Sequence, residues 1–371
     1  MKSLLPHELR EATRLTRSGR LMEATAAIQR LLSPTDHQAT DRGAAERPRT
    51  IDAEAEAEET RFSANAESTT VTPSLLGRIR GLFDKHPHAP APEPGGNPPR
   101  DPIGQYLSRE FRNAAGRRPY KLFVPSGYRG DVVPLVVMLH GCTQSADDFA
   151  AGTRMNLAGE ANTCIIAYPE QIRSANPQKC LNWFKATDQA RDTGEPSLIA
   201  GITREVMRDF AIDARRVYVA GLSAGGATAA VMAATHSDLY TAFGVHSGLA
   251  HGVARDVNSA IAAMRTGVAG ASGTAVGNRA VPAIVFHGDR DTVVNPLNAD
   301  QVVAQAVRNT HLTMRREQGN SGGRAYTRTW FIDATRRTVV EQWTVHGAGH
   351  AWSGGSPKGS FTDPIGPDAT L

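Results

Sequence analysis

The sequence predicts an α/β protein built on a mostly parallel, doubly wound β-sheet. From about residue 105 onward, short apolar runs alternate with helical stretches, an order typical of sheets covered by helices. The central runs are apolar without alternation, as expected for parallel strands buried on both faces. One of them, Val217 to Ala220, leads directly into Gly221-Leu222-Ser223-Ala224-Gly225-Gly226 and then into a helix of small residues.

We expect eight strands in this sheet. The first two are close together and more polar than the rest, which suits an antiparallel edge. Helical segments are expected between most of the others. The expected strands cover residues 106–112, 119–124, 133–139, 164–168, 216–220, 242–247, 282–288 and 338–346.

The chain before this domain has a different composition. Residues 1–32 predict a helical hairpin, because two apolar stripes of helical period flank a break at Ser18-Gly19. The simplest interpretation is a small docking hairpin, and the alternative is an anchor for a partner or a granule surface. The domain itself is expected over residues 105–371.

Residues 33–104 predict a disordered linker, since their Ala/Glu, Ser/Thr and Pro/Gly stretches bury too little apolar surface to offset chain entropy. Within the linker, residues 74–85 predict a short amphipathic helix that rests on the body of the protein or touches a membrane or partner. Its apolar face consists of Leu75, Leu76, Ile79, Leu82 and Phe83.

Composition excludes several classes of function. The 371 residues include 41 Lys and Arg against 37 Asp and Glu, which gives a net charge of +4. The basic residues are scattered along the sequence, so they do not predict a nucleic-acid-binding surface. No apolar stretch reaches the roughly 18 residues of a transmembrane helix. The N-terminus lacks a signal-peptide core, which favours a cytoplasmic location.

The three cysteines predict neither a disulfide framework nor a zinc site, because no C-x-x-C or His/Cys cluster is present. Cys164 begins an apolar run and is expected to be a buried strand residue. Cys142 and Cys180 could be bridged only in an oxidising compartment, and their spacing leaves the question open.

A strand, then G-x-S-x-G, then a helix describes a nucleophile elbow, with Ser223 on a sharp turn whose flanking glycines let the two elements cross closely. A serine hydroxyl is a poor nucleophile at neutral pH and needs a base. In this architecture an acid and then a histidine follow the serine along the chain, on loops after later strands.

Each of those loops offers two candidates. Asp289 and Asp291 follow the strand 282–288, and Asp291 is preferred because it lies further into the loop and can turn back over the sheet edge. Asp289 is expected to hold the turn. His346 ends the strand 338–346, whereas His350 is lifted off it between small residues and is preferred as the base.

These assignments predict acyl transfer. His350 would take the proton from Ser223 and return it to the leaving group, while Asp291 fixes the tautomer. Backbone N–H groups of Ala224 and Cys142 would hold the oxyanion. His140 is expected to support the Cys142 loop rather than act in the reaction.

The polar segment 176–196 is expected to cover the substrate, with Trp183 as a wall of the cleft. Trp352, two residues after His350, is the second aromatic candidate. For both, core packing is an equally good interpretation.

Five motifs, in order, make residues 105–365 resemble the polyhydroxybutyrate depolymerase family of esterases. They are Leu139-His140-Gly141-Cys142-Thr143-Gln144, Cys180-Leu181-Asn182-Trp183-Phe184, Gly221-Leu222-Ser223-Ala224-Gly225-Gly226, His287-Gly288-Asp289-Arg290-Asp291 and Gly349-His350-Ala351-Trp352-Ser353-Gly354-Gly355. The resemblance implies an α/β-hydrolase fold and hydrolysis of carboxylic esters without a cofactor or metal. Ser223, Asp291 and His350 match the triad positions of the family.

The family's substrates include short-chain polyhydroxyalkanoates as well as feruloyl and acetyl esters of plant polysaccharide. The expected function is therefore a serine esterase acting on poly- or oligo-hydroxyalkanoates, with a feruloyl or acetylxylan esterase as the alternative. A non-catalytic, granule-associated binding protein is the alternative outside the enzymes.

Two departures from the family pattern concern the ends of the chain. Secreted members begin with a signal peptide, so extracellular action is the alternative to the cytoplasm. The fold normally closes with a helix after the histidine loop, and this chain is expected to lack it, which would uncover sheet surface.

Overall fold

The structure, a computed structural model, describes residues 104–267, 280–307 and 311–371. The predicted hairpin 1–32, the linker up to residue 103 and the predicted helix 74–85 lie outside the described residues. Among the described helices, none is long and apolar enough to cross a bilayer.

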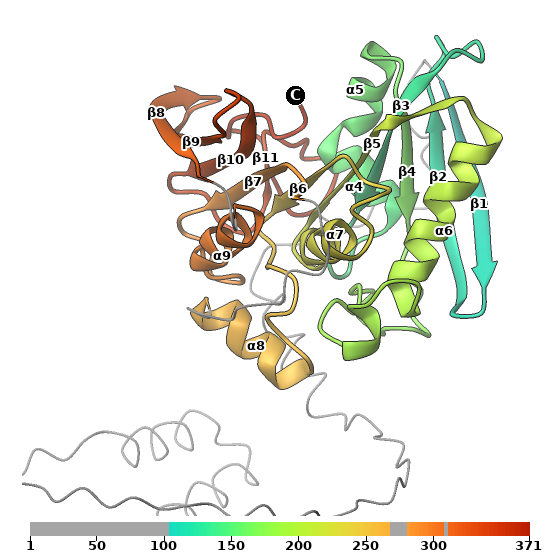
Figure 1. The fold of residues 1–371 in the computed structure, drawn as a ribbon, viewed down its shortest axis with the longest axis horizontal. Coiled ribbons are helices and arrows are strands. Elements are labelled where there is room, and N and C mark those ends of the chain that lie inside the picture. Colours follow the sequence, from blue (N-terminus) through green and yellow to red (C-terminus); the bar gives the residue numbers. More distant parts are fainter. Residues whose placement is uncertain (1–103, 268–279, 308–310) are drawn as a thin grey trace, which may run out of the picture. The chain divides into compact units, whose positions relative to one another are not determined.

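A single large sheet organises this part of the chain (Figure 1). Its order is β1-β2-β4-β3-β5-β6-β7-β10-β9-β8, and neighbouring strands from β4 through β10 run parallel. At one edge, β1 and β2 are antiparallel to their neighbours, and at the other edge β9 and β8 are. The strands are β1 (Gln105–Asn113), β2 (Gly116–Val124), β3 (Val133–Leu139), β4 (Ile165–Pro169), β5 (Ile212–Leu222), β6 (Ala242–His246), β7 (Ala283–Gly288), β8 (Thr313–Ser321), β9 (Arg324–Ile332) and β10 (Thr338–Val345).

The mostly parallel α/β architecture is confirmed, but the expected number of eight strands is wrong, since this sheet has ten. The additional strands, β8 and β9, form a hairpin whose turn is Gly322-Gly323, both with positive φ. Such a two-glycine turn is typical of tight hairpins. Because β8 is almost entirely exposed and polar, it lacks the apolar run that marked the other strands.

Helices cover both faces of the sheet unequally (Figure 1). On one face, α7 (Ala224–Thr235) packs on β5 and β6, α9 (Leu297–Ala306) packs on β7 and β10, and α6 (Gly194–Asp209) packs on the β1 side. On the other face, α4 (Ala146–Thr153) and α5 (Met155–Ala161) pack on β2 and β4. The remaining elements are α8 (Val257–Thr266), the 3-10 turn η1 (Ala186–Asp188) and the short pair β11 (Trp352–Ser353) and β12 (Thr362–Asp363).

The buried core follows from the alternation of side chains along each strand. In β5, Val217 and Val219 are buried in the cluster that includes the small residues of α7. Leu222 belongs to the opposite cluster, with Phe149 of α4 and Trp352. The carboxyl end of β5, where the elbow begins, is therefore packed between these two apolar clusters.

Candidate active site

Ser223 lies between β5 and α7 with φ 57° and ψ −119°, a strained conformation for a residue with a side chain. The crossing of strand and helix leaves no room for other side chains. A Cβ added at Gly225 would lie 1.9 Å from the Leu139 carbonyl oxygen, and one at Gly221 would lie 2.4 Å from the Gly225 carbonyl carbon. The predicted elbow geometry is therefore present.

The loops after β7 and β10 form two separate Asp–His pairs. Nδ1 of His350 lies 2.7 Å from Oδ2 of Asp291, and both side chains are buried. Nδ1 of His346 lies 2.9 Å from Oδ2 of Asp289, where both side chains are more than a third exposed. The structure thus joins the two preferred candidates to each other.

Asp289 has the turn-holding contacts that we expected of it. Its Oδ1 accepts a hydrogen bond from the N–H of Gly347 at 2.7 Å, which links the β7 loop to the β10 loop.

The Asp291 carboxylate accepts hydrogen bonds from backbone and side-chain groups. Its Oδ1 accepts the N–H groups of Val293 and Val294 at 2.9 and 2.8 Å. Burial raises the pKa of Asp291, but the positive charge of His350 and the hydrogen bonds from His287 and His350 outweigh burial and bring the pKa well below its usual range. Asp291 therefore stays ionised beside the imidazole.

His287 is a member of this cluster that sequence reasoning missed. Its Nε2 lies 2.9 Å from the Val294 carbonyl oxygen and 3.3 Å from Oδ2 of Asp291. Its position at the end of β7, four residues before Asp291, is the signal that could have identified it. His287 holds the loop that carries the acid.

The far nitrogen of His350 is not hydrogen-bonded to Ser223 or to any other described residue. Nε2 of His350 is buried and has no hydrogen-bond partner among residues 104–267, 280–307 and 311–371. Since Nδ1 is engaged with Asp291, the proton-accepting position of the neutral ring is Nε2.

The loop after β3 provides the proposed oxyanion donors. The N–H of Gly141 donates to Oε1 of Gln144 at 2.9 Å and that of Thr143 donates to the Gln178 carbonyl at 2.7 Å. Between them, the N–H of Cys142 donates no hydrogen bond within the described chain, and neither does that of Ala224. Both N–H groups are thus free to bind an anion.

His140 supports this loop, in agreement with its expected role. Nε2 of His140 accepts the N–H of Gln171 at 3.0 Å, and Nδ1 donates to the Gly141 carbonyl at 2.7 Å. Burial lowers the pKa of His140 to about 4, so the ring is neutral at physiological pH.

A disulfide joins Cys142 to Cys180, the pairing that the sequence left open. It ties the β3 loop to the segment that carries Trp183. Cys164 is a free, buried thiol, as expected from its place at the start of an apolar run.

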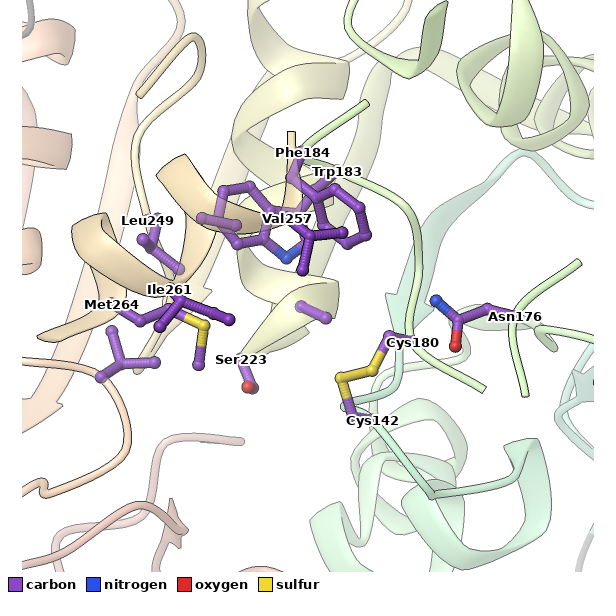
Figure 2. A pocket seen from close by; sticks show the side chains of 13 residues that line it. Cys142, Asn176, Cys180, Trp183, Phe184, Ser223, Leu249, Val257, Ile261 and Met264 are labelled. Atoms are coloured by element: carbon purple, nitrogen blue, oxygen red, sulfur yellow. A yellow bond between two sulfur atoms is a disulfide. The ribbon is translucent and has the colours of Figure 1, made fainter. Parts of the chain in front are cut away.

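Ser223 opens into a largely apolar pocket, in which Trp183 forms one wall and packs edge-on against Phe184 (Figure 2). A second wall comes from α8, which sequence reasoning did not connect with the site. No lining residue is charged. The pocket is lined by Cys142, Asn176, Cys180, Trp183, Phe184, Ser223, Ala224, Leu249, Val257, Ala260, Ile261, Met264 and Val294.

Trp352 does not line this pocket, so the expectation that it forms a wall of the cleft is not met. Its ring stacks on His246 and meets Phe149 edge-on, and its indole N–H donates to Thr370 Oγ1 at 3.0 Å. Trp352 belongs to β11, which pairs with β12, and its side chain is buried in the cluster that contains Phe149 and Leu222.

Comparison with known proteins identifies similar sequences. The model of a family described as "Esterase PHB depolymerase" matches residues 118–322. Poly(3-hydroxyalkanoate) depolymerase C of Paucimonas lemoignei is 32% identical over 240 residues, which cover 61% of this chain and 56% of that protein. Feruloyl esterase B of Neurospora crassa is 32% identical over 118 residues, which cover 32% of this chain and 39% of that protein.

The chain therefore spans about half of the length, or less, of the curated relatives named here. Among solved structures, the acetyl xylan esterase from Aspergillus awamori aligns with a TM-score of 0.54 at 19% identity, covering 66% of this chain and 94% of that one. At that identity the likeness supports the α/β-hydrolase fold alone.

Proposed function

The chain belongs to the PHB depolymerase family of esterases, and on that premise we propose that it hydrolyses carboxylic esters through Ser223, His350 and Asp291. One observation carries the proposal. The buried Asp291–His350 pair leaves the His350 Nε2 atom without a partner in the described chain, while Ser223 stands on a strained elbow at an apolar pocket.

The proposed reaction has two halves. In the first, the Ser223 oxygen attacks the ester carbonyl carbon while His350 Nε2 takes the hydroxyl proton, and the imidazolium then protonates the departing alcohol. In the second, His350 takes a proton from water as the water oxygen attacks the acyl carbon; the bond from that carbon to the Ser223 oxygen then breaks, the imidazolium returns its proton to Ser223, and the acid is released. Asp291 stabilises the imidazolium in both halves.

The oxyanion of each tetrahedral intermediate would accept hydrogen bonds from the N–H groups of Ala224 and Cys142. Each such donor contributes about 2.7–4 kcal/mol to lowering the barrier in enzymes where one has been removed. The disulfide to Cys180 supports this role because it fixes the backbone of Cys142 against the pocket wall.

For the substrate we propose short-chain poly- or oligo-hydroxyalkanoate esters. The relative from Paucimonas lemoignei, named a poly(3-hydroxyalkanoate) depolymerase, supports this class over 61% of the chain. The uncharged lining with Trp183, Leu249 and Met264 suits a neutral aliphatic acyl chain.

A feruloyl or acetylxylan esterase is the second candidate. It is favoured by the similarity to feruloyl esterase B of Neurospora crassa and by the aromatic wall at Trp183 and Phe184, on which a feruloyl ring could stack.

The serine mechanism is tested with p-nitrophenyl butyrate and purified Ser223→Ala. Removing the nucleophile should lower kcat by at least about 10⁴-fold, as loss of a triad serine does elsewhere. Equal turnover by both proteins would rule out the proposed mechanism, and no turnover by either protein would favour the non-catalytic alternative. The wild-type protein is then offered poly(3-hydroxybutyrate), its oligomers, methyl ferulate and acetylated xylan. Release of hydroxybutyrate without ferulate or acetate supports the first substrate class, and the reverse supports the second.

We further propose that the protein works in an oxidising compartment, because disulfides such as Cys142–Cys180 persist there and are rare in the cytosol. The protein purified from its native compartment and denatured without reductant should show one titratable thiol, that of Cys164, out of three cysteines. Three thiols would favour the cytoplasmic location instead.

A further inference from the structure

Among the described residues, no helix covers one part of the sheet. The side chains of β5, β6 and β7 that point away from α7 form what we call the open face, defined by Tyr218, Ala220, Ala242, Gly244 and Ile284. These residues are in register across the three strands. The helices α4 and α5 lie on the same side of the sheet, and their main contacts are with β2 and β4.

The open face is the floor of a groove with a volume of about 460 Å³. Ile284 is 40% exposed in the middle of a strand whose opposite side is fully packed. The groove is also lined by Met155 of α5 and by Val339 and Glu341 of β10. Trp352 and residues 369–371 are further lining residues.

Such a surface needs an occupant. Parallel strands are normally covered on both faces, whereas here Ile284 is exposed and Tyr218, Ala220 and Ala242 are only half-buried. The groove is concave and walled, so it fits an inserted element such as a helix better than it fits a flat surface such as a membrane. The element must supply several large apolar side chains on one face.

The chain contains a segment with that pattern. Over residues 74–85, five large apolar residues share one helical face. We propose that residues 74–85 of the same chain form an amphipathic helix that lies in this groove and covers the open face. The residues that would contact the sheet are Leu75, Leu76, Ile79, Leu82 and Phe83.

The connection is long enough. Residues 86–103 separate this segment from the start of the described chain, and when extended they span up to about 60 Å. From β1, where the described chain begins, the sheet order places β6 five strands away, about 24 Å at the usual strand spacing. The segment can therefore reach the groove without strain, and as part of the same chain it competes well against a second molecule.

Occupation of the groove would also support the candidate active site. The groove is lined by His246, whose Nε2 accepts the N–H of Ser353 at 3.0 Å, and by Trp352, which stacks on it. Trp352 and Ser353 follow His350 by two and three residues, so both contacts are close to His350 along the chain. The inference itself does not depend on the ester chemistry.

Disulfide trapping in the full chain tests the proposal. The native cysteines do not interfere, since Cys142 and Cys180 are bridged and Cys164 is buried. Ile284→Cys is combined in turn with Leu76→Cys, Ile79→Cys or Phe83→Cys from the apolar face, and with Arg80→Cys from the polar face. A further control pairs Ile79→Cys with Val132→Cys, which is 60% exposed and not among the groove residues.

Under mild oxidation, we expect one or more of the apolar-face pairs to form an intramolecular disulfide. This disulfide should form at least about tenfold faster than in the Arg80→Cys pair or the Val132→Cys pair. The reason is that a disulfide requires Cα atoms within about 7 Å of each other. Peptide mapping identifies the bridge. Equal rates for all pairs would overturn the proposal. Disulfide-linked dimers alone would show that a second copy occupies the groove, which also overturns it.

A second measurement does not depend on the register of the helix. Ile79→Asp/Phe83→Asp should increase binding of an apolar dye and hydrogen exchange in β6 and β7 by several-fold, whereas Arg80→Asp should change neither. Because the described sheet contains none of the substituted residues, these variants should fold. If both variants behave like the wild type, the segment does not cover the open face.

Discussion

At the scale of single residues, the loop after β7 carries two carboxylates with different environments. Asp291 is buried and contacts the imidazoles of His350 and His287 and two backbone N–H groups. Asp289, two residues earlier, is partly exposed and pairs with His346. The two acids are alike in chemistry and close in sequence, so they form a natural pair of test and control.

Asp291→Asn should lower kcat on p-nitrophenyl butyrate by about 10³–10⁴-fold, because an amide cannot hold the reactive tautomer of His350 or stabilise its positive charge. Asp289→Asn should stay within about tenfold of the wild type, since its partner His346 is on the surface. Steady-state kinetics of both variants check this. A larger loss in Asp289→Asn than in Asp291→Asn would reverse the assignment.

At the scale of elements, the crossing of β5 and α7 on β3 depends on glycines. Gly221 and Gly225 let the three backbones approach until an added Cβ would overlap neighbouring atoms. Their absent side chains are what allow Ser223 to stand at the tip of the turn, with α7 buried behind it along almost its whole length. The elbow therefore depends on packing as well as on local conformation.

Gly225→Ala should destabilise the protein by about 3 kcal/mol or more, because its Cβ would lie 1.9 Å from a backbone oxygen that cannot move independently. By the usual scaling for a domain of this size, Tm should fall by more than about 5 °C. Gly349→Ala is the matched control, since an added Cβ there meets no atom within 4 Å and Tm should move by less than about 2 °C. Thermal melts followed by circular dichroism distinguish the two, and similar shifts would contradict the packing argument.

At the scale of the whole molecule, several histidines are buried in their neutral form. Burial lowers the pKa of His246 to about 3, with a further contribution from the nearby His287 and His350. Burial also lowers the pKa of His140 and His236 to about 4. In the unfolded chain these groups titrate near 6.5, so the unfolded state binds more protons between the two values.

Stability should therefore be highest above pH 6.5 and fall as pH decreases from about 6.5 toward 4, since protonation favours the unfolded state throughout that window. Asp291 adds to the loss mainly at and below the lower end of that window, because its pKa is lowered in the folded protein while the same carboxyl in the unfolded chain takes up a proton near pH 3.9. Urea unfolding at a series of pH values measures the slope.

His236→Gln is the informative variant for this dependence. His236 lies at the C-terminal end of α7, the end opposite Ser223, and loss of its titration should reduce the slope. An unchanged slope would mean that His236 is not a source of the pH dependence.

What the sequence determined by itself is local in origin. The apolar runs of the parallel strands, the turn at Gly221 to Gly225, and the order of serine, acid and histidine along the chain follow from side-chain periodicity and backbone freedom over a few residues. These features were sufficient to predict the fold class and the candidate residues Ser223, Asp291 and His350. The polar strand β8 was missed because its stability comes from pairing with β9 and not from an apolar run of its own.

The tertiary structure decided which of these groups meet. The pairing of Asp291 with His350, separated by 59 residues, and of Cys142 with Cys180, separated by 38, depends on where the sheet brings distant loops together. The same holds for Trp352, which β11 turns away from the pocket, and for α8, which supplies one of its walls. The physical reason is that contacts between residues far apart in the chain form only when the whole sheet is assembled, so no local pattern in the sequence encodes them.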